Sequence, residues 1–85
     1  MKKVSIYTTP TCMYCKMAKE FFQANNVQYE EFDVASDEAK RNEMVEMTGQ
    51  MGVPVIAVAD EGGQPDIVIG FDKGHLAGLL GITVA

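Results

Sequence analysis

Two cysteines separated by two residues lie where a strand pattern gives way to a helix pattern. Cys12 and Cys15 are the only cysteines of the chain. Residues 3–8 before them are rich in β-branched and aromatic side chains, which predicts a strand. Apolar residues at helical spacing follow: Tyr14, Met17, Ala18, Phe21 and Phe22. A Cys-x-x-Cys pair at such a junction, within a strand–helix–strand unit, indicates dithiol–disulfide chemistry.

The position of Cys12 at the start of the expected helix, residues 12–24, favours its ionised form. The first turn of a helix has unpaired N–H groups and the positive end of the helix dipole. Thr11 is expected to be the N-cap of this helix. Cys15 and Lys16 follow three and four residues after Cys12, on the same helical face. We therefore expect Cys12 to be the nucleophile and Cys15 the resolving thiol, with Lys16 stabilising the thiolate.

The rest of the chain predicts three more strands and two more helices. Strands are expected at residues 28–34, 55–59 and 67–69, and helices at residues 36–49 and 72–82. The strand at 28–34 should lie at a sheet edge, where Glu30 and Glu31 would discourage pairing with other chains. Residues 60–65 are expected to form the hairpin loop between the last two strands. Since strand–helix–strand crossovers are right-handed, the strands at 3–8 and 28–34 should be parallel.

Capping residues mark the boundaries of the two later helices. The segment Ser36-Asp37-Glu38 is expected to open the first of them by capping and early acidic charge, and Gly49 to end it, while Asp72 is the expected cap of the second. Three apolar residues are expected to form the buried stripe of the first: Met44, Val45 and Met47. Glycines within the last helix, Gly81 among them, are each expected to weaken it by up to about 1 kcal/mol relative to alanine.

Length and charge limit the possible function classes. With 85 residues the chain forms one small domain, residues 1–85. Its net charge of −5 and the lack of a basic cluster beyond Lys2-Lys3 argue against nucleic-acid and membrane partners. No apolar run suits a signal peptide or a membrane span, so we expect a cytoplasmic protein. In that compartment two lone cysteines are more often catalytic than structural.

The order and spacing of three short segments resemble the glutaredoxins, and the resemblance covers essentially the full chain. The segments are Cys12-Met13-Tyr14-Cys15, Val53-Pro54 and Gly70-Phe71-Asp72. The resemblance implies an α/β domain with a thioredoxin-like fold. Its four-stranded mixed sheet would have the order 2-1-3-4, with strands 3 and 4 an antiparallel hairpin and three flanking helices. It also implies a monomer that needs no bound metal or cofactor.

The same resemblance implies a site for an extended substrate beside the cysteines. Pro54 would be cis and face the pair, and the backbone of Val53 would hydrogen-bond the substrate. Glutathione would be the co-substrate, with its γ-glutamyl end near Asp72 and the start of the last helix. The substrate-binding residues expected on this basis are Thr11, Tyr14, Val53, Pro54, Gly70, Phe71 and Asp72.

Three positions depart from the glutaredoxin pattern. Met13 replaces the usual proline between the cysteines, and Thr9 replaces a lysine that helps bind glutathione. A single Gly70 followed by Phe71 replaces a double glycine and resembles the NrdH-type redoxins, which thioredoxin reductase reduces. We expect reduction of protein disulfides or glutathione mixed disulfides, and the electron donor, glutathione or thioredoxin reductase, stays open.

The alternative from another class is a non-catalytic metal or iron–sulfur carrier. A zinc site needs four ligands, and the chain offers two cysteines and the distant His75. A cluster shared between two chains would need a Cys12 that is free of its internal partner, and Cys15 competes for it as a disulfide partner. Redox chemistry at the cysteine pair is therefore the preferred hypothesis.

Overall fold

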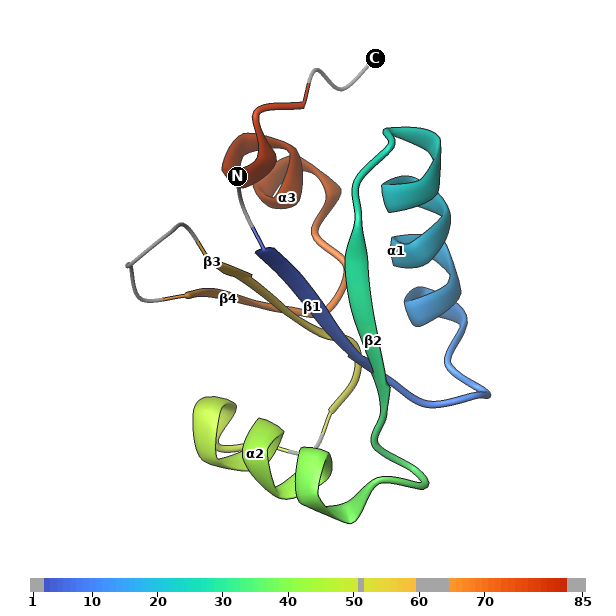
Figure 1. Cartoon of the computed structure of the whole chain (residues 1–85), viewed down its shortest axis with the longest axis vertical. Coiled ribbons are helices and arrows are strands. Elements are labelled where there is room, and N and C mark those ends of the chain that lie inside the picture. The colour runs from blue at the N-terminus through green and yellow to red at the C-terminus, as the bar shows by residue number, and fades with distance from the viewer. Residues whose placement is uncertain (1–2, 51, 60–64, 83–85) are drawn as a thin grey trace.

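The computed structural model of the protein describes residues 3–50, 52–59 and 65–82. Its elements are β1 (Lys3–Thr8), α1 (Met13–Ala24), β2 (Tyr29–Asp33), α2 (Glu38–Thr48), β3 (Val55–Ala59), β4 (Asp66–Ile69) and α3 (Lys73–Leu80) (Figure 1). This is the expected order of strands and helices. The expected hairpin loop falls on residues 60–65, of which 60–64 lie outside the described residues.

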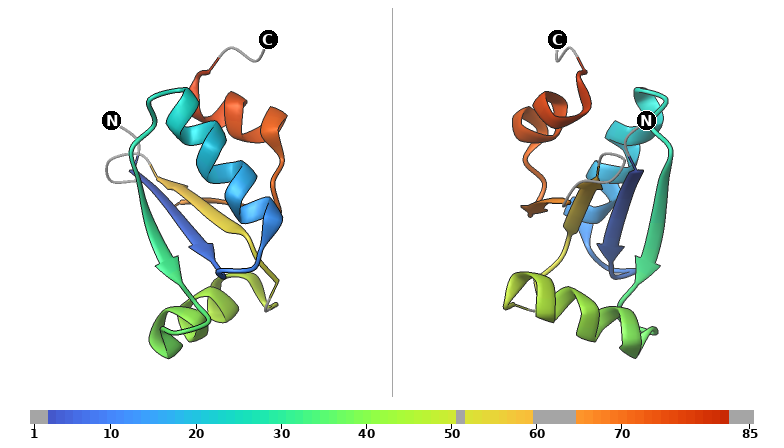
Figure 2. Two further views of the ribbon diagram at one scale, coloured as in Figure 1. Left: turned by 90° about the vertical axis from the view of Figure 1, so that its right-hand side faces the viewer. Right: turned by 60° about the vertical axis from the view of Figure 1, so that its left-hand side comes forward.

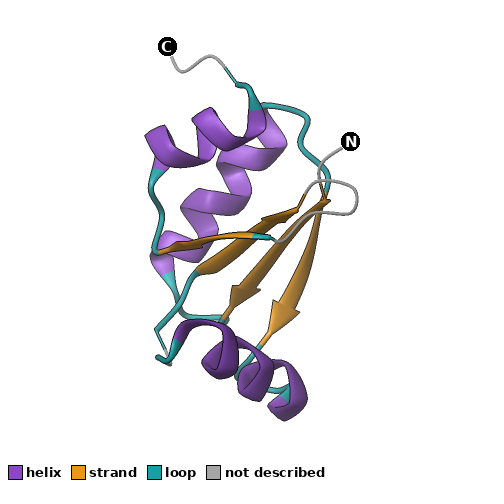
Figure 3. Ribbon diagram, turned by 90° about the vertical axis from the view of Figure 1, so that its left-hand side faces the viewer, coloured by secondary structure: helices purple, strands orange, loops and turns teal. Residues whose placement is uncertain are grey.

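The four strands form one mixed sheet in the order β2-β1-β3-β4, which confirms the predicted topology. β1 pairs with β2 in parallel, with Val4 opposite Tyr29. β3 is antiparallel to both of its neighbours, with Ile56 opposite Ile6 on β1 and Val68 on β4. β2 lies at a sheet edge, as expected, and Figure 3 shows the four strands side by side.

The main core lies between one face of the sheet and the helices α1 and α3, which lie beside each other (Figure 2). Phe22 and Leu76 reach it from the two helices, and Val4 and Ile6 reach it from alternate positions of β1. All four side chains are at most 2% exposed. Their burial holds α1 over the sheet, and the cysteine pair lies at the start of this helix.

A smaller core lies on the opposite face, where Tyr7, Val34 and Val55 surround Met44 of α2. α2 follows β2 in the chain and lies at the end of the sheet where β2 ends (Figure 1). The predicted apolar stripe of this helix was therefore wrong in part. Met44 is fully buried, but Met47 is 37% exposed, and α2 also meets the sheet through the polar side chains Glu43, which accepts from the Tyr7 hydroxyl, and Lys40, which lies over the Phe32 ring.

Side chains and glycines bound the helices much as predicted. Asp37 caps α2 by accepting the backbone N–H of Lys40 at 3.1 Å, and Asp72 caps α3 by accepting that of His75 at 3.1 Å. Gly49 ends α2 in the left-handed conformation. Gly81 does the same for α3, so it ends this helix rather than weakening its interior. None of the described helices has the length and apolar character needed to cross a membrane.

Candidate redox site

Cys12 itself, rather than Thr11, caps α1. Its backbone is extended, and its sulfur accepts the backbone N–H of Cys15 at 3.2 Å. The expectation of Thr11 as the cap was wrong, because the helix begins one residue later and the sulfur takes the place that a hydroxyl oxygen normally occupies. The sulfur therefore lies against the unpaired N–H groups and the positive dipole end of α1.

The two free thiols differ sharply in their access to solvent. Cys12 is partly exposed, whereas Cys15 is only 1% exposed. Burial is the main cause that raises the pKa of the Cys15 thiol to about 12, and hydrogen bonding to Cys12 adds to it. An approaching disulfide can therefore reach Cys12 directly, while Cys15 is protonated and covered near neutral pH.

Because the pKa of Cys15 is raised, the free energy of unfolding of the reduced protein should change with pH in the alkaline range. The thiol is neutral in the folded state up to a pH of about 12, but in the unfolded chain it ionises near its ordinary value of 9.0. The unfolded state therefore loses its proton first, so the free energy of unfolding should fall as pH rises from about 9 toward 12. The slope is about 1.4 kcal/mol per pH unit for one such group.

Denaturant titrations at several pH values on reduced protein and on Cys15→Ser check this expectation. Tyr7, whose pKa is raised from 10.0 to about 12 mainly by burial, titrates in the same direction in both proteins. Since Tyr7 acts equally in both proteins, the difference between their slopes from about pH 9 upward is due to Cys15, and the interval from about pH 9 to 10 shows it before Tyr7 begins to contribute. Equal slopes in that interval would show that Cys15 is not a buried, protonated thiol.

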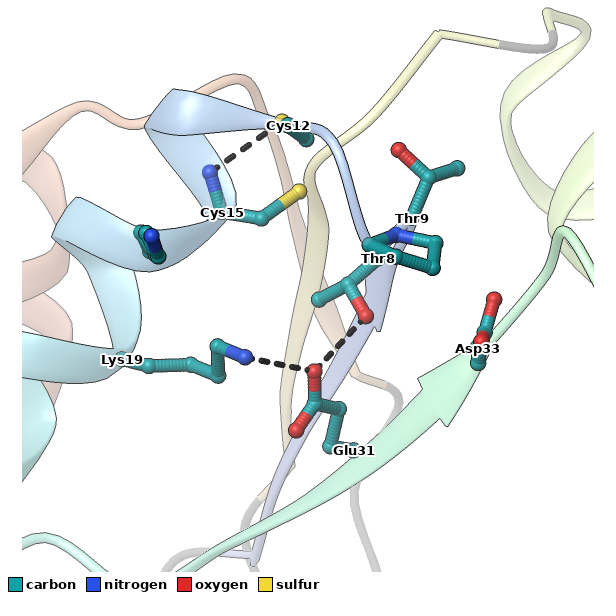
Figure 4. A pocket seen from close by; sticks show the side chains of 9 residues that line it. Thr8, Thr9, Cys12, Cys15, Lys19, Glu31 and Asp33 are labelled. Atoms are coloured by element: carbon teal, nitrogen blue, oxygen red, sulfur yellow. Dashed lines mark hydrogen bonds and ion pairs between the residues drawn. The ribbon is translucent and has the colours of Figure 1, made fainter.

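A charged pocket of about 220 Å³ lies beside the two sulfurs (Figure 4). In it Lys19 donates to Glu31 Oε2 at 2.8 Å, and the hydroxyl of Thr8 donates to the same oxygen at 2.8 Å. These bonds raise the pKa of Lys19 and lower that of Glu31, so both groups stay charged. The sequence analysis missed this network, because its members are 12 and 23 residues apart and no local pattern links them.

Lys16, the lysine singled out from the sequence, is an exposed residue that lines the same pocket. Lys19 lies one turn further along α1, and its positive charge is the one that lowers the pKa of Cys15. Spacing alone favoured Lys16 because it follows Cys12 by four residues. The stabilisation of the Cys12 thiolate by Lys16 stays a prediction, whereas the tertiary fold anchors Lys19 near Cys15, since Glu31 of β2 lies opposite Lys19.

A second cavity, a groove of about 320 Å³, lies next to Tyr14. It brings together six of the seven residues that were expected to bind substrate: Tyr14, Val53, Pro54, Gly70, Phe71 and Asp72. Thr11, the seventh, is exposed and lines neither this groove nor the charged pocket. Ile69, at the end of β4, also lines the groove and is 53% exposed, but its strand pattern gave no signal of this role.

Two loops are joined at the floor of this groove. The Val53–Pro54 peptide bond is cis, as the resemblance implied, and the carbonyl of Pro54 accepts the N–H of Gly70 at 2.8 Å. Gly70 has a φ of 82°, a conformation that glycine adopts without steric cost. The segment before α3 is thereby held against the segment before β3.

The groove is lined mainly by apolar side chains, and none of the described residues that line it is cationic. Apolar side chains near it and along the exposed side of α1 are unusually accessible: Met13 is 74%, Tyr14 62% and Met17 43% exposed.

Within the described part of the chain, no group of three or more His, Cys, Asp or Glu residues could hold a metal ion. The dithiol with its two cavities is therefore the chemistry-bearing site that these residues form.

Comparison with known proteins gives a consistent result. The sequence model of the glutaredoxin family matches residues 4–62. Glutaredoxin 3 of Escherichia coli strain K12 is 35% identical over 82 residues, covering 94% of this chain and 99% of that protein. Between them, the family match and this relative cover the cysteine pair, the cis proline and nearly all of the sheet.

Solved structures support the same fold. A crystal structure of a mutant of the thioredoxin-like protein BC3987 has a TM-score of 0.82 and 38% identity, covering 98% of this chain and 100% of that one. NrdH-redoxin from Escherichia coli, described as glutaredoxin-like with a thioredoxin-like activity profile, has a TM-score of 0.73. Its identity of 19%, over 98% of this chain and 97% of that one, shows a shared fold.

Proposed function

Because the chain belongs to the glutaredoxin family, we propose that it is a cytoplasmic thiol–disulfide oxidoreductase that reduces protein disulfides and glutathione mixed disulfides. Cys12 and Cys15 carry the reaction. The observation that supports this most strongly is the contrast between a reachable sulfur at a helix N-terminus and a buried thiol one turn behind it. Thiol–disulfide exchange at these two cysteines requires no bound metal or organic cofactor.

The reaction proceeds in two displacements. The thiolate of Cys12 attacks one sulfur of the substrate disulfide, forms a mixed disulfide and releases the other sulfur as a thiolate, which takes up a proton. Cys15 then loses its proton and attacks the Cys12 sulfur. This second step closes the Cys12–Cys15 disulfide and releases the reduced substrate. The protein has lost two electrons, and a reductant restores its dithiol.

The groove is the proposed binding site for the substrate chain that flanks the attacked sulfur. The backbone of Val53 and the first turn of α3, which Asp72 caps, supply polar groups. Tyr14, Ile69 and Phe71 supply apolar contacts. A polypeptide with an apolar residue next to its cysteine matches this combination.

A second candidate concerns the electron donor, which is thioredoxin reductase rather than glutathione in this alternative. The specific observation is the groove itself, whose described lining residues include Asp72 and no cation. Glutathione carries two carboxylates, and a groove that offers them no positive side chain favours a protein donor. The net charge of −5 acts in the same direction.

One paired assay separates the two donors. Turnover of a small disulfide is measured with glutathione, glutathione reductase and NADPH, and separately with thioredoxin reductase and NADPH. We expect turnover in at least one arm, and none in either arm with Cys12→Ser. Turnover only with thioredoxin reductase would remove glutathione as co-substrate, and its absence from both arms would contradict the proposed function.

A variant of Thr9 sharpens the assay. Thr9→Lys restores the cation of the glutaredoxin pattern, and one added charge-assisted hydrogen bond should raise glutathione-dependent turnover about fivefold or more. The thioredoxin reductase arm should not gain. Thr11→Lys is the matched control, since Thr11 is exposed and lines neither cavity.

A further inference from the structure

The second displacement depends on Cys15, which is almost completely buried. The proposed reaction therefore needs a group that stabilises the thiolate of Cys15 once the mixed disulfide has formed. The groove does not include Cys15 among its lining residues, whereas the charged pocket does. The charged pocket is thus the place to look for this help.

Charged and titratable groups face this pocket from α1 and its cap and from β2. Cys12, Lys16 and Lys19 lie on the α1 side, and Glu31 and Asp33 lie on β2, while the end of β1 contributes threonines. Figure 4 shows Cys15 and Lys19 projecting from the same helix toward the space between α1 and the strands. Glu31 holds the Lys19 ammonium in place there, and the buried Thr8 hydroxyl holds Glu31.

The influences on Cys15 change when Cys12 reacts. In the dithiol, burial, the hydrogen bond to Cys12 and the charge of Cys12 all favour the protonated thiol. The backbone hydrogen bond of Thr9, which is the larger influence, and the charge of Lys19 favour the thiolate. A Cys12 sulfur in a mixed disulfide is neutral, so its repulsion disappears and its hydrogen bond weakens, while the contributions of Lys19 and Thr9 persist.

We propose that Lys19, anchored by Glu31, is a positioning residue for the second displacement, in which its ammonium stabilises the Cys15 thiolate once Cys12 has entered the mixed disulfide. The inference rests on the proposed function. The proton of Cys15 leaves through the charged pocket to solvent. The new sulfur–sulfur bond joins Cys15 to Cys12, the bond from Cys12 to the substrate sulfur breaks, and that sulfur departs with the electron pair. The pair Lys19–Glu31 is itself unchanged.

Rapid mixing of reduced protein with an equimolar aromatic disulfide, 5,5′-dithiobis(2-nitrobenzoate), observes the two displacements separately. Release of the first coloured thiolate reports the attack of Cys12 on the reagent. Release of the second reports the attack of Cys15 on the mixed disulfide at Cys12. With Lys19→Gln we expect an unchanged first phase, a second phase about tenfold slower near neutral pH, and a pH midpoint of that phase moved upward by about one unit. Lys19→Arg, which keeps the charge, should restore the second phase.

Lys40→Gln is the matched control. Lys40 also forms an ion pair with a glutamate, at 3.2 Å to Glu43, and its side chain is 32% exposed against 28% for Lys19. It lies on α2, outside the charged pocket, so both phases should stay as in the unmodified protein. If the circular dichroism spectrum shows that the glutamine variant does not fold, Lys19→Met, which keeps the aliphatic stem, repeats the test.

The outcomes distinguish this inference from the proposed function. A second phase that is equally fast with lysine, glutamine and methionine at position 19 would overturn the role of Lys19, as would equal slowing of both phases. The absence of a first phase in the unmodified protein would instead contradict the proposed function. A slowed second phase with an upward midpoint, reversed by arginine, supports the inference.

Discussion

Replacing Cys12 with serine is expected to lower disulfide turnover on the order of a thousandfold or more, because a hydroxyl is not ionised at neutral pH and is a far weaker nucleophile than a thiolate. Cys12 is the sulfur that an external disulfide can reach, whereas Cys15 lies 1% exposed behind it. Reduction coupled to NADPH oxidation, with a protein disulfide as substrate, measures the loss.

Cys15→Ser is the informative companion variant. It keeps the first displacement but lacks the thiol that resolves the mixed disulfide, so a stable adduct on Cys12 should accumulate and be visible by mass spectrometry. With a glutathionylated substrate and excess glutathione, this variant should retain turnover, since glutathione can resolve the intermediate. A stable adduct on Cys15 in the Cys12→Ser protein, together with retained turnover, would reverse the two roles.

Phe22→Ala should have the largest effect on stability, with a loss of about 3–5 kcal/mol in the free energy of unfolding. Phe22 is fully buried between α1 and the sheet, with its ring 5.4 Å from that of Tyr29 and 6.0 Å from that of Phe21. Small domains have a total stability of about 5–15 kcal/mol, so this one cavity removes a large share of it. Urea unfolding followed by circular dichroism gives the value.

Tyr14→Ala is the control for this prediction, because it removes an aromatic ring of similar size from the same helix. Tyr14 is 62% exposed, and its loss should change the free energy of unfolding by no more than about 0.5 kcal/mol. If the two variants were equally stable, the packing of α1 on the sheet would not be the main support of the cysteine pair.

The site is divided between two cavities with different tasks. The apolar groove beside Tyr14 and Pro54 suits the substrate chain, and the charged pocket around Lys19 and Glu31 suits the proton and charge changes at the sulfurs. The proposed donor and the proposed role of Lys19 can therefore be tested independently.

Much of this architecture could be predicted because it depends on local patterns. The alternation in β1, the apolar run of β3 and the capping residues Asp37 and Asp72 each act within a few residues of chain. The parallel pairing of β1 and β2 followed from the handedness of their crossover, whereas the full strand order came from the family resemblance. The cis bond before Pro54 came from the family resemblance rather than from the residues themselves.

What the sequence did not reveal depends on side-chain contacts between distant elements. Glu31 was interpreted only as an edge charge, yet its carboxylate accepts from both Lys19 and Thr8 across the α1–β2 layer. The shift of the N-cap from Thr11 to Cys12 is a displacement of one residue, within the usual uncertainty of helix boundaries. The exposure of Met47 reflects where α2 meets the sheet, which its own periodicity cannot specify.

The two sulfurs divide the proposed reaction by their access to solvent, and competitive alkylation tests this division without any mutation. Fully reduced protein is treated near neutral pH with less than one equivalent of iodoacetamide, and the modified peptide is fragmented to locate the label. The account predicts that the label is on Cys12, with Cys15 modified only after the protein is unfolded. A label found first on Cys15, or equally on both cysteines in the folded protein, would contradict it.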